Sequence, residues 1–148
     1  MTHKPDDFRL IYHWRAGSMP PPYHYEYTIH LGPGSSGEII FHPDYPAHEP
    51  PVWRETFSIT KELLDQLYAL MISQNIFRQH WTVKENAPVG GSQDWLEVIA
   101  DKHRYNIPAR AEERERLATI YRAIRDLVPT PIWDGMMARR EQFKEGYI

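Results

Sequence analysis

The chain has 148 residues, a net charge of −3 at pH 7 and no cysteine, which excludes disulfide bonds, thiolate metal sites and cysteine nucleophiles. Its apolar fraction of 41% and charged fraction of 25% are typical of globular domains. Acidic and basic residues are interspersed, so the sequence lacks the clustered positive face that binds a nucleic-acid backbone. We therefore expect a single domain over residues 1–148 and no nucleic-acid partner.

The N-terminal segment and the apolar runs indicate the compartment. Residues 1–9 are polar, include Asp6 and Asp7, and lack the apolar core of a signal peptide. The longest apolar run, Leu67 to Ile72, has about six residues, whereas a membrane-spanning helix needs roughly 20. We expect a cytoplasmic protein with no membrane partner.

The first half of the chain has the pattern of β-strands. Residues 8–15 alternate, with Phe8, Leu10, Tyr12 and Trp14 on one face. Residues 23–31 alternate again, and the glycine-rich turn 32–37 leads into a hairpin partner at 38–42. A proline-rich loop follows at 43–51, and a fourth strand is predicted at 52–59.

The register of the hairpin follows from its polar and apolar pattern. If the numbers of paired residues add to an even number, one face collects His24, Glu26, Thr28, His30, Glu38, Ile40 and His42. The other face then collects Tyr25, Tyr27, Ile29, Leu31, Ile39 and Phe41. An odd sum would place Ile39 and Phe41 among the histidines, so the even register is predicted.

The second half of the chain is mainly helical. Thr60 is the expected N-cap of a helix to about residue 73, whose inward stripe is Leu63, Leu64, Leu67, Leu70 and Met71. A second hairpin is predicted from 94–100 and 103–107, turning at Asp101-Lys102.

Two further helices are predicted after this hairpin. Residues 111–128 form an amphipathic helix that Pro129 ends, and Thr130 with Pro131 matches the N-cap and first position of a third helix. The fold class is therefore α+β: an antiparallel sheet of four to six strands, covered on its apolar face by two or three helices.

The polar face of the 23–42 hairpin suggests a metal site. Side chains opposite each other across two strands have Cβ atoms about 4.5–5.5 Å apart. Histidine and carboxylate groups at that spacing can hold a divalent metal such as zinc. The candidate ligands are His24, Glu26, His30 and His42, with Glu38 as the alternative catalytic residue, a general base for metal-bound water. The competing interpretation is a solvated sheet face.

Two other groupings are weaker candidates. His42, Asp44 and His48 form a second set of ligand-type side chains in the proline-rich loop. A small-molecule pocket between sheet and helices would be lined by Tyr25, Tyr27, Phe57 and Trp95, which also fit a core.

Composition favours binding over catalysis. The sequence contains no Gly-x-Ser-x-Gly motif and no phosphate-binding loop with its Lys-Ser or Lys-Thr. It has five tryptophans, nine tyrosines and thirteen prolines, and Tyr, Trp and Arg are enriched at binding hot spots. We expect a non-catalytic cytosolic binding or protein-interaction module without a cofactor, with a protein partner or as a homo-oligomer. The alternative is a metal-dependent enzyme of hydrolase type.

Overall fold

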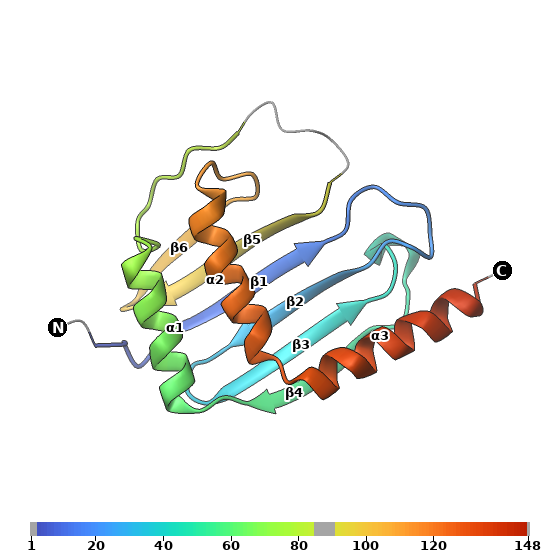
Figure 1. Ribbon diagram of the computed structural model, residues 1–148, viewed down its shortest axis with the longest axis horizontal. Coiled ribbons are helices and arrows are strands. Elements are labelled where there is room, and N and C mark those ends of the chain that lie inside the picture. The colour runs from blue at the N-terminus through green and yellow to red at the C-terminus, as the bar shows by residue number, and fades with distance from the viewer. Residues whose placement is uncertain (1–2, 85–90, 148) are drawn as a thin grey trace.

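The computed structural model describes residues 3–84 and 91–147, which form one sheet and three α-helices (Figure 1). The strands are β1 (Arg9–Arg15), β2 (Glu26–Leu31), β3 (Ser36–His42), β4 (Trp53–Ser58), β5 (Gln93–Ala100) and β6 (His103–Ile107). The helices are α1 (Lys61–Ser73), α2 (Arg114–Leu127) and α3 (Thr130–Glu145), with a short 3-10 turn at Pro46–His48. The predicted α+β class is confirmed.

The six strands lie in the order β4-β3-β2-β1-β5-β6, and all neighbours are antiparallel. All three helices lie on the same face of this sheet, α1 and α2 across its strands and α3 toward one end (Figure 1). The opposite face is not covered by any helix of the described residues. None of these helices is long and apolar enough to cross a membrane.

The predicted β2–β3 register is confirmed. Glu26 pairs with His42, Thr28 with Ile40, and His30 with Glu38, and each pair adds to an even number. The alternate residues, which face the helices, are buried: Tyr27, Ile29, Leu31, Ile39 and Phe41. Separation of polar from apolar side chains therefore fixed this register.

Helix α1 begins as predicted but presents a slightly different face. The Thr60 hydroxyl accepts a hydrogen bond from the backbone N–H of Leu63 at 3.2 Å, which confirms the N-cap. The buried residues are Leu64, Leu67, Tyr68 and Met71. Leu63 is 43% exposed, so its predicted inward position was wrong. The observed stripe follows the i, i+3, i+4, i+7 spacing, which leaves Leu63 at its edge.

The start of α3 differs from the prediction by one residue. Pro129 is the N-cap, with an extended ψ of 138°, and Thr130 is the first helical residue. The Pro129 carbonyl accepts a hydrogen bond from the N–H of Ile132 at 2.9 Å. Pro129 therefore both ends α2 and starts α3, and no side chain caps the beginning of α3.

The β5–β6 hairpin turns at Asp101 and Lys102, as predicted. Both residues have left-handed φ angles, 51° and 64°, as a tight hairpin turn requires. The Asp7 carboxylate accepts the backbone N–H groups of both residues at 2.8 Å. The segment before β1 therefore stabilises a turn more than ninety residues away along the chain.

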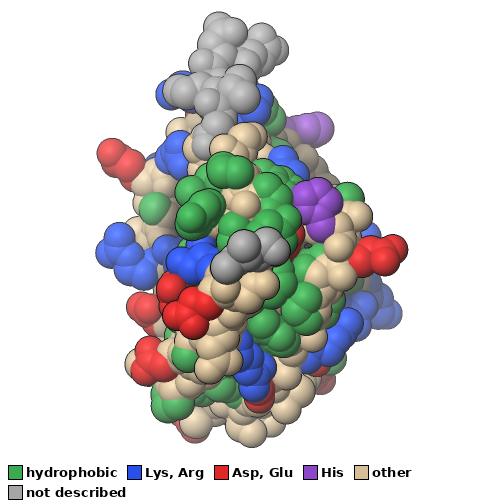
Figure 2. Space-filling view, turned by 90° about the vertical axis from the view of Figure 1, so that its right-hand side faces the viewer, with side chains coloured by type: hydrophobic (Ala, Val, Ile, Leu, Met, Phe, Trp, Pro, Cys, Tyr) green, Lys and Arg blue, Asp and Glu red, His purple; other side chains and the backbone are tan. Residues whose placement is uncertain are grey.

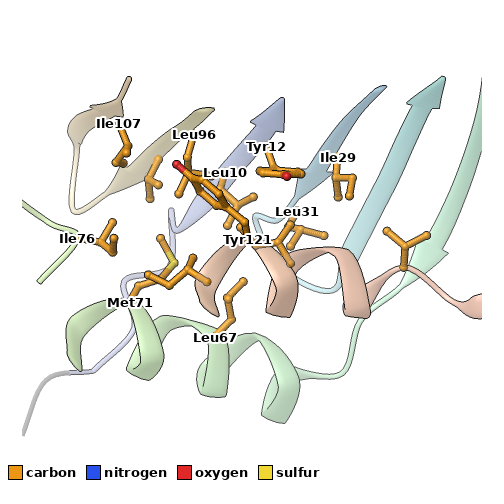
Figure 3. Packing of buried hydrophobic residues seen from close by; sticks show 14 of the residues in the cluster. Leu10, Tyr12, Ile29, Leu31, Leu67, Met71, Ile76, Leu96, Ile107 and Tyr121 are labelled. Carbon is orange, nitrogen blue, oxygen red and sulfur yellow. The ribbon is translucent and has the colours of Figure 1, made fainter. Parts of the chain in front are cut away.

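The core lies between the sheet and the first two helices (Figure 3). Leu10, Tyr12 and Ile29 of the sheet face Leu67 and Met71 of α1 and Tyr121 of α2. Burial of each large apolar side chain stabilises the fold by roughly 1.5–3 kcal/mol.

Candidate functional site

Four of the predicted metal-site residues lie on the uncovered sheet face. Glu26 and His30 belong to β2, Glu38 and His42 belong to β3, and all four are half-buried. His24 lies in the loop before β2 and is only 2% exposed. Glu26, His30, Glu38 and His42 therefore lie on neighbouring strands, as expected. His24 was predicted to extend the same strand but lies outside it.

Protein oxygen atoms contact both ring nitrogens of His24. Nδ1 is 3.1 Å from the carbonyl oxygen of Gly17, and Nε2 is 2.7 Å from the Glu26 carboxylate. The ring also stacks on Tyr45, with centroids 3.7 Å apart. A metal could bind His24 only by displacing one of these contacts.

The remaining histidines do not complete a ligand set. Burial lowers the pKa of His30, while Glu38 opposes this shift. Burial also lowers the pKa of His42, against the effect of Glu26, and its buried Nδ1 has no hydrogen-bond partner in the described residues. Within residues 3–84 and 91–147, no three His, Asp or Glu side chains are grouped so as to hold a metal ion. The metal site and its base Glu38 stay predictions without an assembled set of ligands.

The proline-rich loop contains a buried carboxylate that contacts an exposed histidine. Asp44 is buried, and its carboxylate lies 3.3 Å from Nδ1 of His48. Its second oxygen accepts the N–H of Tyr45 at 2.7 Å. These contacts stabilise the bend of the loop, which is a structural role.

The rest of the uncovered face is polar and largely paired. His13 Nε2 lies 2.6 Å from the Glu97 carboxylate, and the His13 ring stacks on Trp95 with centroids 4.9 Å apart. Trp95 therefore lies on the opposite face from Tyr27, and the pocket predicted to contain both is wrong. This face matches the solvated side of an antiparallel sheet.

A different surface is formed where β1 and β3 end and where β2 and β4 begin. We call it the aromatic end and define it by Trp14, Met19, Tyr23, Tyr25, Val52, Trp53 and Tyr147. Met19, Tyr23, Val52 and Tyr147 are 44–50% exposed, and the others are half-buried. Figure 2 looks at this end of the molecule and shows hydrophobic side chains gathered across its middle, with charged side chains and a histidine directly beside them.

A row of packed aromatic rings supports the aromatic end. Trp14 lies 4.8 Å from Tyr25, Tyr25 lies 5.5 Å from Phe41, and Phe41 lies 5.6 Å from Trp53, measured between ring centroids. The row crosses strands β1, β3 and β4. Rings packed in this way are held rigidly, so the exposed edges lose little conformational entropy when they contact another molecule.

Helix α3 and the Tyr45 side chain hold the loops of this end in place. Arg140 donates to the Tyr23 carbonyl at 2.9 Å, and its guanidinium lies 4.1 Å from the centre of the Tyr25 ring. The Tyr45 hydroxyl bonds both the N–H and the carbonyl of Met19, at 3.2 and 2.7 Å. The exposed apolar side chains are thus carried on an ordered backbone.

Sequence reasoning missed the aromatic end because its residues come from distant segments. One signal was present: Met19 and Tyr23 flank the run Pro20–Pro22, and Val52 follows Pro51. Proline restricts the loop backbone and places neighbouring apolar residues outside the sheet interior.

Comparison with known proteins adds no family. A scan against protein-family models found no match to this chain. A search of curated proteins also found no similar sequence. The residues and their geometry therefore carry the functional argument.

Proposed function

We propose that this protein is a non-catalytic binding module that holds a partner protein on its aromatic end. One observation carries the proposal. Seven large hydrophobic side chains are exposed in the described residues, and four of them (Met19, Tyr23, Val52 and Tyr147) belong to this one surface. Scattered exposed apolar residues are ordinary, but a contiguous group of them marks an interaction site.

The chemistry of the surface favours a protein partner with apolar side chains. Tyrosine, tryptophan and methionine are enriched in protein interfaces, and they supply contact area with few rotatable bonds. The nearby cations already have partners, since Arg139 pairs with Glu55 at 3.0 Å and Lys144 with Glu141 at 2.8 Å. The surface therefore interacts with a partner mainly through apolar contacts.

We further propose a cytoplasmic location and a partner that is either a second copy of the chain or a different protein. The absence of cysteine is compatible with a reducing compartment. A surface of this composition would also be a liability if it stayed uncovered, because exposed apolar patches promote aggregation.

A matched pair of variants tests the proposal. Val52 and Val83 are both valines and are 44% and 42% exposed, but only Val52 lies on the aromatic end. Tagged full-length protein with Val52→Glu or Val83→Glu would be expressed in the native host. Its mass would be measured by light scattering and its bound proteins by quantitative mass spectrometry.

We expect Val52→Glu to lose a second copy or a bound protein that both the wild type and Val83→Glu retain. A charge placed in an apolar contact that carries binding energy is expected to weaken binding by about tenfold or more. Equal masses and equal sets of bound proteins for wild type and Val52→Glu would contradict the proposal. A loss in both variants would indicate general destabilisation and would equally remove support for this surface.

A further inference from the structure

A separate cavity of about 360 Å³ lies between α2 and the beginning of β5. Its walls come from β5 (Asp94), from the segment before α2 (Arg110 and Ala111) and from α2 itself (Arg114, Tyr121 and Arg125). The volume is within the range of small-molecule sites, about 300–1,000 Å³. The cavity contains none of the residues that define the aromatic end.

One residue that lines this cavity carries a buried polar group without a partner. The Tyr121 side chain is only 4% exposed, and its hydroxyl makes no hydrogen bond to any described residue. Figure 3 shows Tyr121 reaching from α2 toward the sheet beside Tyr12. Burial and the nearby Asp94 raise the pKa of Tyr121, so the hydroxyl stays protonated and available as a donor. A buried hydroxyl without a partner is costly, and a bound molecule would remove that cost.

Beside it, a fixed chain of hydrogen bonds orients two charged groups. The Tyr12 hydroxyl donates to the Asp94 carboxylate at 2.9 Å and accepts from Nη1 of Arg125 at 2.7 Å. The backbone carbonyl of Arg125 separately accepts a hydrogen bond from Nε1 of Trp133 at 3.0 Å. Asp94 and Arg125, held by the shared Tyr12 hydroxyl, thus line the cavity together with Tyr121 in a preorganised arrangement.

The wall of the cavity is strongly basic for an acidic protein. Arg110, Arg114 and Arg125 line it against the single carboxylate of Asp94, whereas the whole chain has a net charge of −3. The ion pairs of the described residues include none to these three arginines. Guanidinium groups bind carboxylate and phosphate through paired hydrogen bonds.

We propose that this cavity binds a small organic anion, with its carboxylate or phosphate at the arginines and a hydroxyl or amine at Tyr121 and Asp94. Arg110 and Arg114 bind the charged head group. The Tyr121 hydroxyl and the Asp94 carboxylate select ligands that can both accept and donate a hydrogen bond at the other end. Leu117, Ala118 and Ala111 supply apolar contacts between these two ends.

Three probes separate the possible head groups. The full-length protein would be titrated by calorimetry and thermal shift with ribose 5-phosphate, citrate and inorganic phosphate, with sodium chloride of equal ionic strength as the salt control. We expect ribose 5-phosphate or citrate to bind at millimolar concentration or below, and inorganic phosphate to bind more weakly because it cannot reach Tyr121. The better of the first two identifies the head group.

Three variants locate the binding. Arg110→Gln with Arg114→Gln should weaken binding by about tenfold or more. Tyr121→Phe should weaken it about fivefold, which is the loss of one hydrogen bond, without lowering the Tm of the ligand-free protein. Arg122→Gln, on the exposed side of the same helix, is the control and should bind like the wild type.

Two results would overturn the proposal. One is that none of the three probes shifts the Tm or releases heat beyond the salt control. The other is that a probe binds equally well to the wild type and to the double arginine variant or to Tyr121→Phe, which would place the binding elsewhere on the surface.

Discussion

Two buried tyrosines lie side by side beneath α2, with ring centroids 5.0 Å apart, yet their hydroxyl groups have opposite surroundings. Tyr12 bridges Asp94 and Arg125, whereas the Tyr121 hydroxyl has no partner in the described residues. We expect Tyr12→Phe to lower the free energy of unfolding by about 1–3 kcal/mol, because it leaves a carboxylate and a guanidinium without their shared partner. Tyr121→Phe should leave it unchanged or raise it.

Urea unfolding of the two variants measures this difference directly. Equal destabilisation by both substitutions would contradict this prediction. It would mean that the Tyr121 hydroxyl makes a hydrogen bond in the folded protein.

His30 gives a prediction for pH. Its folded-state pKa is lowered, first by burial, so the folded protein binds this proton less readily than the unfolded chain, whose imidazole keeps a pKa of about 6.5. The contribution of neutral His30 to the free energy of unfolding is complete above the unfolded-state pKa. It is lost as the pH falls through the folded-state pKa. We expect a nuclear magnetic resonance titration of His30 to give a pKa below about 6.5.

The same shift predicts how a variant behaves. The stability of His30→Gln should fall less than that of the wild type between about pH 7 and pH 5, because glutamine does not titrate. A steeper fall in the stability of His30→Gln than of the wild type would contradict the lowered pKa assigned to His30.

At the scale of single residues, the sequence predicted faces but not contacts. Alternation placed Glu26, His30 and His42 on one face, as observed. It could not place His24, whose ring is fixed by Gly17 and Tyr45, because those contacts depend on how a loop outside the strand folds back.

At the scale of elements, the β2–β3 connection depends on glycine at one position more than at another. Gly32 and Gly34 both have positive φ angles, 74° and 79°. A Cβ at Gly32 would lie 2.5 Å from the carbonyl oxygen of Phe8, whereas a Cβ at Gly34 would meet nothing within 4 Å. The contact at Gly32 is with backbone, so β1 and its preceding segment would have to move.

We therefore expect Gly34→Ala to lower the free energy of unfolding by about 1–2 kcal/mol, the cost of a left-handed alanine. Gly32→Ala should cost more than this because the collision adds to the same backbone penalty. Thermal and urea unfolding measure both variants. Equal losses would show that the close approach to Phe8 is relaxed at little cost.

Elements were predictable where their signals are local. The Thr60 cap, the Asp101-Lys102 turn and the even register all depend on residues close together in sequence or on strict alternation. The start of α3 was displaced by one residue because Pro129 serves two helices, and Leu63 was misplaced because a five-residue stripe is wider than the face that α1 buries.

At the scale of the whole molecule, both proposed sites were beyond the reach of sequence patterns. The aromatic end combines the ends of four strands with the segment after α3, and the cavity combines β5, the segment before α2 and α2 itself. The sequence indicated the fold class and the tyrosine, tryptophan and proline content, but only the sheet order brings Tyr23, Val52 and Tyr147 to one surface. Such sites depend on tertiary arrangement, which local periodicity does not encode.

The most direct test of partner binding at the aromatic end is hydroxyl-radical footprinting of the full-length chain, free and with its captured partner. Tyr23 and Trp53 report on the aromatic end, Trp95 on the uncovered sheet face, and Tyr105 on β6. We predict that the partner slows oxidation of Tyr23 and Trp53 and leaves Trp95 and Tyr105 unchanged. Protection of Trp95 with Tyr23 and Trp53 unchanged would contradict the account and would place the partner on the polar face of the sheet.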